Sequence, residues 1–349
     1  MRAAVLKEVG ILEVQDVPEP EPAPDQIKVK IAYCGICGTD PEIIEGRFGM
    51  GIYPEGAIGK PPQRLLIPPG GRIMGHEASG TIVEVGKDIR GDFKKGQQVA
   101  MNFRSACGAC YYCNNMMEHF CEMTTPNTGA MAEYALYQEN TVFPLPEDIS
   151  LEAGAFLEPV SVAVHTLDIA QMKVGDSVII TGAGAIGLLI MQLAIRSGAS
   201  KVLVSEPFAE KRNLARELGA DVVVDPLNED LLEAARKLTD GRGFDVCFEA
   251  SGKPDVARQL ILLAEGCGTI VWAAVYPTES EVGVPIFYMY QKELSIRSVK
   301  ISPYSFPRSM QLLPKLNLKP LITVFPLDEA AQAFEAHKAG RGIKIMLKP

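Results

Sequence analysis

The chain has 349 residues, of which 47% are hydrophobic and 22% charged, so it is long enough for two packed domains and too apolar to be disordered. Its formal net charge of -9 argues against nucleic acid or an anionic membrane surface as a main partner. No apolar run approaches the roughly 20 residues of a membrane span. The opening MRAAVLKEVG also lacks the apolar core of a signal peptide. We therefore expect a cytoplasmic protein.

The first part of the chain, to about residue 150, is expected to be rich in β-strands. In QIKVKIAY the apolar residues Ile27, Val29 and Ile31 alternate with polar ones, which is the period of a strand with one buried face. TIVEVG and AEYALYQ are similar short runs between glycines and prolines. The stretch DVPEPEPAPD contains too many prolines for regular structure and is expected to be an exposed connection.

After about residue 160, short apolar strands alternate with segments of helical length. VIIT precedes AIGLLIMQLAIRSG, and KVLVSE precedes AEKRNLARELG. The series continues with VVVD, DVCFEA and TIVWAA, and SIRSV near residue 296 is expected to be its last strand. This alternation predicts a parallel sheet built from βαβ units.

The segment VIITGAGAIG carries a G-x-G-x-x-G arrangement between a predicted strand and a predicted helix, which is the context of a dinucleotide-binding loop. Gly182 permits the tight turn, Gly184 lets the backbone approach a pyrophosphate, and Gly187 lets the helix pack closely on the sheet. The free N–H groups and the positive end of the helix dipole would face the phosphates.

An acidic residue follows the second strand of this region, in KVLVSEP. The Glu206 carboxylate can accept hydrogen bonds from both ribose hydroxyls of NAD, and it would repel the 2′-phosphate of NADP. We therefore expect NAD to be preferred, with some tolerance of NADP because Lys211 and Arg212 lie on the following helix.

Four of the eight cysteines, Cys107, Cys110, Cys113 and Cys121, lie within fifteen residues of one another. Without an export signal, this spacing indicates a metal site rather than disulfides. Four thiolates suit a closed tetrahedral zinc site that stabilises a loop and leaves no position for substrate. His119 lies in the same stretch and is expected to be a surface residue rather than a ligand.

A second set of ligand-type residues is scattered along the chain. It comprises Cys37 in CGICGTD, His76 and Glu77 in GHEASG, and Glu158 in LEPVSVAVH. Each is weak evidence alone, because a single histidine beside a glycine is more often structural. Together, one thiolate, one imidazole and one carboxylate can form a three-ligand zinc site with a fourth position open.

These motifs together resemble the medium-chain, zinc-containing alcohol dehydrogenase family, and the resemblance covers essentially the whole chain. It rests on GHEASGTIVEVG, the four-cysteine loop, LEPVSVAVH, the GAGAIG turn and the closing GIKIMLKP. It implies an α/β protein with a GroES-like β-rich catalytic domain, residues 1–158 and 298–349, and an inserted Rossmann domain, residues 159–297. It also implies a doubly wound parallel sheet in the Rossmann domain, an active site in the cleft, and a homotetramer or homodimer.

The family pattern assigns roles residue by residue. Cys37 and His76 match the first two catalytic zinc ligands, and Glu158 matches the third, which is a cysteine in the simplest alcohol dehydrogenases. Glu77 matches a carboxylate that binds the metal directly or through water, and Thr39 matches the hydroxyl that receives the substrate proton. Lys211 matches a residue that supports Glu206 at the ribose. The full cofactor-binding set is expected to be Gly182, Gly184, Ile186, Gly187, Glu206 and Lys211.

A glutamate at position 158 resembles the polyol, sorbitol and threonine dehydrogenase branches. The resemblance therefore implies an NAD-linked enzyme with one catalytic and one structural zinc that oxidises a secondary alcohol of polyol, sugar or cyclitol type. Threonine, butanediol and aminocyclitol dehydrogenases remain open alternatives. A zinc-ribbon interaction module would explain neither GAGAIG nor GHEASG, and a zinc-free quinone or enoyl reductase would not need Cys37, His76 and Glu158 together.

Two features depart from the family pattern. Many relatives have a histidine at the outer end of the proton relay, where this chain has Glu42. Glu42 is either the terminal proton acceptor or is bypassed by water. The stretch Gly46–Gly75 is longer than usual and rich in Gly and Pro, which predicts an irregular loop. It either borders the substrate cleft or forms a surface or subunit contact.

Two further expectations concern single residues. Lys344 falls where relatives often have a cation near the cofactor phosphates. The remaining cysteines, Cys34, Cys247 and Cys267, are expected to be buried thiols.

Overall fold

The computed structural model describes residues 1–47, 58, 67–127, 129–277 and 279–349. The chain folds into two compact units. The first contains residues 1–158, 310–314 and 321–349, and the second contains residues 159–309 and 315–320. The second unit includes residues 298–309, which follow the expected boundary at residue 297, and in it the hydroxyls of Ser302 and Ser305 hydrogen-bond to Ser161.

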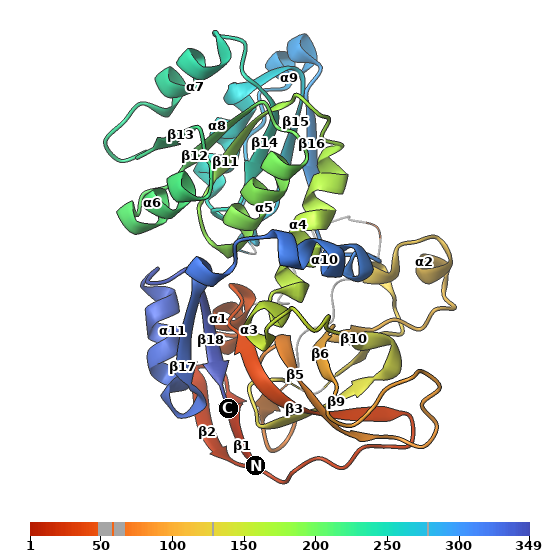
Figure 1. The fold of residues 1–349 in the computed structure, drawn as a ribbon. Coiled ribbons are helices and arrows are strands. Elements are labelled where there is room, and N and C mark those ends of the chain that lie inside the picture. The colour runs from red at the N-terminus through yellow and green to blue at the C-terminus, as the bar shows by residue number, and fades with distance from the viewer. Residues whose placement is uncertain (48–57, 59–66, 128, 278) are drawn as a thin grey trace. The chain divides into compact units, whose positions relative to one another are not determined.

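The first unit is built around a seven-stranded sheet (Figure 1). Its strands follow the order β10-β6-β5-β3-β18-β17, and β9 also pairs with β3. The bounds are β3 (Gln26–Gly35), β5 (Glu77–Val85), β6 (Gln98–Met101), β9 (Tyr134–Gln138), β10 (Val142–Pro144), β17 (Ile322–Pro326) and β18 (Lys344–Lys348). Because β18 pairs with β3, the two ends of the chain form one sheet, as the sequence resemblance implies.

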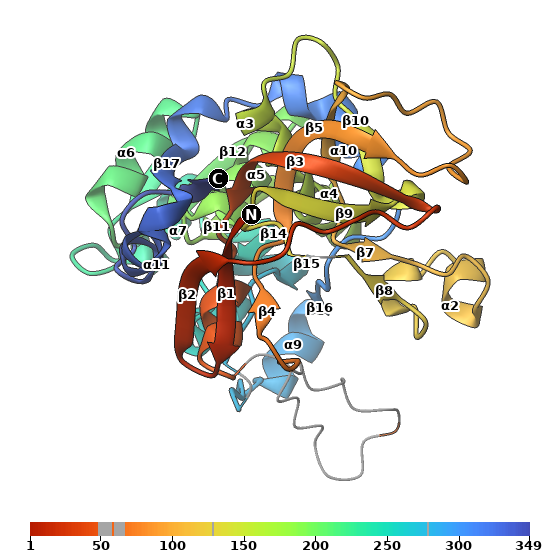
Figure 2. The same ribbon diagram turned by 90° about the horizontal axis from the view of Figure 1, so that it is seen from below.

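Smaller elements complete the first unit. A three-stranded sheet has the order β2-β1-β4, and a two-stranded sheet joins β7 and β8. Figures 1 and 2 both place the two chain termini close together in this unit. The remaining bounds are β1 (Arg2–Glu8), β2 (Ile11–Asp16), β4 (Arg72–Ile73), β7 (Arg104–Ser105), β8 (Thr125–Pro126), α1 (Thr39–Ile44), α2 (Tyr111–Asn114), α3 (Leu151–Gly154) and α11 (Ala330–Lys338).

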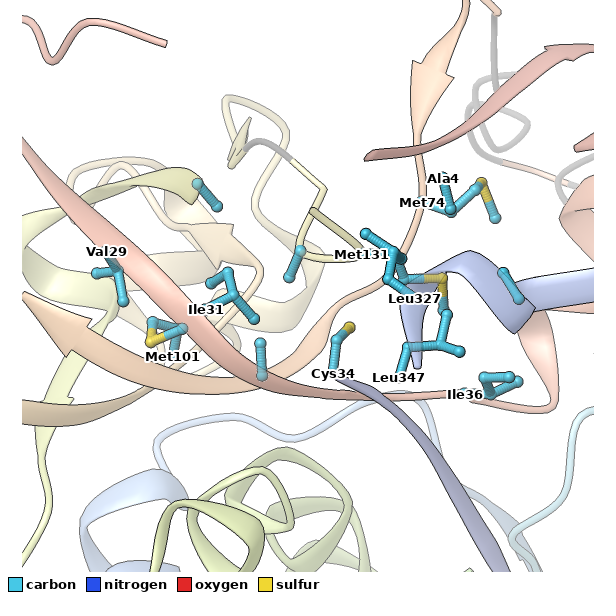
Figure 3. Close-up of a cluster of buried hydrophobic side chains, with 14 of the residues drawn as sticks. Ala4, Val29, Ile31, Cys34, Ile36, Met74, Met101, Met131, Leu327 and Leu347 are labelled. Carbon is cyan, nitrogen blue, oxygen red and sulfur yellow. The ribbon is translucent and has the colours of Figure 1, made fainter. Parts of the chain in front are cut away.

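The main hydrophobic core of the first unit lies against the seven-stranded sheet (Figure 3). Strand β3 contributes the buried side chains Val29, Ile31 and Cys34, and β18 contributes Leu347. Met74 and Met131 fill the space beside them, as flexible methionine side chains often do. This packing surrounds the carboxyl end of β3, which ends two residues before Cys37.

The second unit contains a six-stranded parallel sheet with the order β13-β12-β11-β14-β15-β16. All five residues of β11 are buried, as expected for a strand covered on both faces. This strand order is that of the Rossmann fold, so the predicted fold class is confirmed. The bounds are β11 (Ser177–Thr181), β12 (Lys201–Ser205), β13 (Val222–Val224), β14 (Phe244–Glu249), β15 (Ala264–Trp272) and β16 (Ser295–Ser298).

Helices connect the parallel strands. Leu231 of α7 and Leu260 of α8 pack with Ile179, Leu203 and other strand residues in one buried cluster on the sheet. Asp230 is the N-cap residue of α7, and its carboxylate accepts hydrogen bonds from two backbone N–H groups of the first turn of the helix. The bounds are α4 (Leu157–Ala170), α5 (Ala185–Arg196), α6 (Ala209–Glu217), α7 (Leu231–Thr239), α8 (Pro254–Leu263), α9 (Ile286–Lys292) and α10 (Phe306–Leu312).

Three expectations outside the sites can be compared with the structure. Cys34 and Cys247 are buried as expected, but Cys267 is exposed, so that expectation is wrong. Cys267 itself has a positive φ of 62° and lies in β15 where the pairing with β14 is irregular. Most of the predicted loop at 46–75, namely residues 48–57 and 59–66, lies outside the described residues. Among the described residues, no helix is long and apolar enough to cross a membrane.

Candidate active site

The pairing of β3 with β5 explains why distant ligand-type residues meet. Gly35 on β3 lies opposite Glu77 on β5 in an antiparallel register. Cys37 follows Gly35 by two residues, and His76 directly precedes Glu77. The metal-binding atoms of Cys37, His76 and Glu77 all lie within 4.8 Å of one another. The structure therefore brings together one sulfur, one nitrogen and one oxygen donor in the first unit.

Asp40 supports two members of this group and is fully buried. One of its carboxylate oxygens accepts a hydrogen bond of 2.8 Å from the Cys37 backbone N–H. The other lies 3.5 Å from Nδ1 of His76. A carboxylate behind a metal-binding histidine orients the ring and favours one tautomer. The sequence interpretation did not assign Asp40 a role, although its position three residues after Cys37 could have suggested one.

Glu77 is held by a buried lysine. Nζ of Lys344 donates hydrogen bonds to Oε2 of Glu77 at 2.5 Å and to the carbonyl oxygen of Ile36 at 3.1 Å. Both side chains of the ion pair are at least 95% buried. The structure therefore places Lys344 beside the candidate metal ligands, and its contact with the cofactor phosphates stays a prediction. The absence of a side chain at Gly35 leaves room for the Glu77 carboxylate, since a Cβ there would lie 2.3 Å from Oε2 of Glu77.

Glu158, in the first turn of α4, is also buried, but it is not part of the compact donor group formed by Cys37, His76 and Glu77. Burial, together with the charge of Glu77, raises the pKa of Glu158 to about 7. Burial opposes the charged form of His76, yet the charges of Asp40 and Cys37 raise its pKa well above the usual value.

Cys37, Asp40, Glu77 and Glu158 lie together with the cationic groups Lys344, His76 and Arg72. Buried charges of both signs are tolerated only where each has partners. The donor set of sulfur, nitrogen and carboxylate oxygen fits zinc.

The four-cysteine loop forms a second donor group in the first unit. The sulfurs of Cys107, Cys110, Cys113 and Cys121 lie within 4.8 Å of one another, and the group does not include His119. The measured separations are 3.9 Å for Cys107–Cys113, 3.6 Å for Cys110–Cys113 and 3.9 Å for Cys110–Cys121. Tetrahedral zinc with Zn–S bonds of about 2.3 Å requires sulfurs about 3.8 Å apart. The geometry therefore fits a closed tetrathiolate site.

Backbone N–H groups favour the thiolate form of Cys107 and Cys110. The N–H groups of Ala109 and Cys110 point at the sulfur of Cys107 and lower its pKa to about 6. Thiolates are the species that bind zinc. All eight cysteines lie in described residues and are free thiols, so no disulfide competes for these sulfurs.

The dinucleotide loop lies between β11 and α5 in the second unit. Gly182 has a φ of 92°, and a Cβ there would lie 2.9 Å from backbone atoms of Ala250 and Ser251. A Cβ at Gly187 would lie 1.9 Å from the carbonyl oxygen of Gly182. Gly184, the N-cap of α5, has open space where its Cβ would be, and Ile186 lies in the first turn of the helix. The loop thus has the close packing and open face that a bound pyrophosphate requires.

Glu206 follows β12 and is buried. Its carboxylate accepts hydrogen bonds from the backbone N–H groups of Ala183, at 2.7 Å, and Phe208, at 3.0 Å. It therefore fixes the glycine loop and still has lone pairs for a ribose. The Nζ atom of Lys211 lies 4.9 Å from the centre of the Phe208 ring. Its expected support of Glu206 at the ribose remains a prediction.

The residues expected to form the proton relay lie on α1, of which Thr39 is the first residue. The Glu42 carboxylate accepts two hydrogen bonds from the Arg47 guanidinium, at 2.8 and 2.9 Å. This contact lowers the pKa of Glu42. A carboxylate held in this way is a weak proton acceptor at neutral pH, so the structure favours the alternative in which water follows Thr39.

Comparison with known proteins agrees with this geometry. A family described as alcohol dehydrogenase GroES-like domain matches residues 23–147, and one described as zinc-binding dehydrogenase matches residues 185–315. The chain is 34% identical to L-threonine 3-dehydrogenase of Pyrococcus furiosus, covering 96% of this chain and 94% of that protein. It is 31% identical to sorbitol dehydrogenase of Ovis aries, covering 97% and 94%.

A solved structure shares the whole fold. It is a zinc-binding dehydrogenase from Sinorhizobium meliloti bound to NADP, 31% identical, with a TM-score of 0.90 over 100% of this chain and 99% of that one. The chain thus belongs to the zinc-dependent medium-chain alcohol dehydrogenase family. It is an oxidoreductase that uses zinc and a nicotinamide dinucleotide to act on a small-molecule alcohol.

Proposed function

We propose that this enzyme transfers hydride reversibly between NAD and a secondary alcohol of polyol, sugar or cyclitol type. The observation that carries the proposal is the grouping of the Cys37, His76 and Glu77 donor atoms within 4.8 Å. Two further observations support the substrate class: the carboxylate of Glu158 beside this group, and the similarity to a sorbitol dehydrogenase.

Two zinc sites follow from the donor sets. Cys37, His76 and Glu77 would hold the catalytic zinc, and Glu158 would either bind the same ion or lie beside it. The structural zinc would be held by Cys107, Cys110, Cys113 and Cys121. A catalytic zinc supplies Lewis acidity that lowers the pKa of an alcohol hydroxyl toward neutrality. Asp40 would keep the His76 ring oriented, and Lys344 would keep Glu77 from moving freely.

The chain's own groups would then handle the proton and the cofactor. The Thr39 hydroxyl accepts the substrate proton and passes it to water, because Glu42 is held by Arg47. The glycine loop and the first turn of α5 bind the pyrophosphate. Glu206 accepts hydrogen bonds from the ribose hydroxyls and disfavours NADP. The nicotinamide supplies the hydride acceptor.

A second candidate is oxidation of an amino-alcohol such as threonine. The similarity to the Pyrococcus furiosus L-threonine 3-dehydrogenase favours it, and a butanediol dehydrogenase is a related alternative. The same zinc sites and cofactor loop serve all three reactions. We also infer from the family that the enzyme works as a homotetramer or homodimer.

Reduction of NAD, followed by nicotinamide absorbance, tests the substrate class. The zinc-loaded enzyme is assayed with polyols, cyclitols, threonine, butanediol and simple alcohols, in separate reactions. The proposal expects kcat/KM to be highest with a polyol or cyclitol. Highest activity with threonine or butanediol would replace the polyol proposal by the second candidate. Activity only in the reverse assay, reduction of a ketone with NADH, would mean that the enzyme works as a ketone reductase.

A further inference from the structure

Glu249, the last residue of β14, is a fully buried carboxylate that none of the roles above uses. Its Oε1 accepts a hydrogen bond of 2.7 Å from the Ser251 backbone N–H and another from the Ser251 hydroxyl. Its Oε2 accepts a hydrogen bond of 3.1 Å from the Gly252 N–H and another from the Tyr276 hydroxyl. A buried charge is tolerated only with such a complete set of donors.

These hydrogen bonds join separate loops. The side chain binds the turn at 251–252 and, through Tyr276, the segment that follows β15. The main-chain carbonyl of Glu249 accepts hydrogen bonds from Ala273, at 2.9 Å, and Ala274, at 3.2 Å. One residue therefore fixes both loops through side chain and main chain together.

The same turn contacts the dinucleotide loop. The Ala250 N–H donates a 2.8 Å hydrogen bond to the carbonyl of Thr181, which directly precedes Gly182. Backbone atoms of Ala250 and Ser251 lie so close that no side chain would fit at Gly182. On the other side, a Cβ at Gly252 would lie 3.0 Å from the carbonyl oxygen of Val275. The three segments are thus packed backbone against backbone.

All three segments lie at the carboxyl ends of parallel strands. Strands β11 and β14 are neighbours, although they are far apart in sequence, and the strand order reverses there. In doubly wound sheets, dinucleotides bind at this reversal, outside the carboxyl ends of the strands. The three segments therefore border the place where the cofactor binds.

We propose that Glu249 is a positioning residue for the cofactor: its carboxylate holds the glycine loop, the 251–252 turn and the 273–276 segment in the arrangement that binds the nicotinamide dinucleotide. The inference rests on cofactor binding by the second unit and is independent of the alcohol substrate. Replacing the carboxylate with an amide places a donor against the N–H and O–H donors, so the turn loses its fixed geometry.

A matched control lies on the same strand. The Asp245 carboxylate, at the other end of β14, accepts hydrogen bonds from the Ser177 N–H, at 2.8 Å, and the Ser177 hydroxyl, at 2.7 Å. It therefore also joins β14 to β11, but at the amino ends of the strands, away from the dinucleotide loop. Asp245→Asn reports the effect of a weakened sheet without a change at the cofactor loops.

The test is equilibrium binding of NADH to the full-length, zinc-loaded enzyme, with no alcohol present. The single tryptophan, Trp272, lies opposite Glu249 on β15 and 6.4 Å from the Tyr276 ring, and we expect a bound reduced nicotinamide to quench its fluorescence by energy transfer. We expect Glu249→Gln to raise Kd for NADH about tenfold and Tyr276→Phe about threefold. Asp245→Asn should change Kd less than about twofold even where it lowers Tm. In turnover, Glu249→Gln should raise KM for NAD while kcat at saturating NAD stays within about twofold.

Two outcomes overturn the proposal and are distinguishable. If Glu249→Gln binds NADH as tightly as the wild type and only lowers Tm, Glu249 is structural and the cofactor assignment stands. If the wild-type enzyme quenches with neither NADH nor NADPH, the cofactor assignment itself fails, and the role of Glu249 fails with it.

Discussion

Nζ of Lys344 lies 2.5 Å from Oε2 of Glu77, although the two residues are 267 positions apart in the sequence. The contact joins the strand at the C-terminal end of the chain to the strand that begins with a candidate zinc ligand. It thus links the stability of the first unit to the geometry of its metal site.

Removing this lysine should destabilise the protein strongly. Lys344→Met leaves the Glu77 carboxylate without its buried partner, and breaking a buried pair costs about 3–5 kcal/mol. The matched control is the exposed Lys338, whose half-buried partner Glu45 lies 3.4 Å away; the control variant is Lys338→Met, and surface pairs contribute about 1 kcal/mol or less. Urea unfolding of the zinc-loaded proteins at neutral pH measures both. Equal, small losses in the two variants would mean that the Lys344–Glu77 pair does not stabilise the fold.

The four-cysteine loop should depend on zinc for its structure. Cys113→Ser replaces a buried thiolate in the candidate tetrathiolate site, so we expect the bound zinc to fall by about one ion per chain and Tm to decrease. Cys267→Ser, an exposed thiol outside the group, is the control and should change neither value. Elemental analysis of the purified proteins measures the zinc. Full zinc content in Cys113→Ser would rule out this site.

Glu42 should be dispensable for proton transfer. Because Arg47 lowers its pKa, Glu42→Gln should keep kcat within about threefold and leave the pH profile unchanged. Thr39→Val, which removes the proposed proton acceptor, should lower kcat by about 100-fold or more. A loss of that size in Glu42→Gln would instead make Glu42 the end of the relay.

The ion pair between Glu42 and Arg47 should stabilise the fold in a pH-dependent way. A carboxylate whose pKa is lowered in the folded state stabilises the fold at neutral pH, and this contribution disappears as the pH falls through its folded pKa. The difference in free energy of unfolding between wild type and Glu42→Gln should therefore be largest near pH 7 and shrink in acid, below the usual glutamate pKa of about 4.3. Urea unfolding across this range measures it, and a difference independent of pH would contradict the Arg47 contact.

Glu206 should set the preference for NAD. Glu206→Gln removes the negative charge that strengthens hydrogen bonds from the ribose hydroxyls and repels a 2′-phosphate. The kcat/KM for NAD should therefore fall about tenfold, and the ratio of kcat/KM for NAD to that for NADP should decrease. Glu210→Gln, an exposed position in the first turn of α6, is the control. Unchanged selectivity in Glu206→Gln would mean that other residues determine the cofactor.

The sequence predicted those features that depend on local spacing. The turn from Gly182 to Gly187 could be assigned because strand, glycines and helix are consecutive, and the four cysteines because they lie in one short loop. The parallel sheet followed from its alternation of strands and helices, and the last strand was correctly placed near residue 296.

Features that depend on tertiary packing could not be predicted in this way. The Lys344–Glu77 pair arises from the pairing of β18 with β3 and of β3 with β5, which no local pattern encodes. The donors to Glu249 come from its own turn, from Tyr276, 27 residues later, and from the Thr181 hydroxyl on β11. The contact of Arg47 with Glu42 required the geometry of the turn that ends α1. The resemblance supplied the site residues, and the structure supplied their contacts.

The most direct test of the central claim combines turnover with metal content in one variant, Cys37→Ala. The enzyme is assayed for NAD reduction on its best alcohol, and its zinc is measured in the same sample. If Cys37 holds the catalytic zinc, turnover is abolished, bound zinc falls by about one ion per chain, and the four-cysteine site stays loaded. Retained turnover after loss of that zinc would contradict a zinc-dependent mechanism at Cys37, His76 and Glu77.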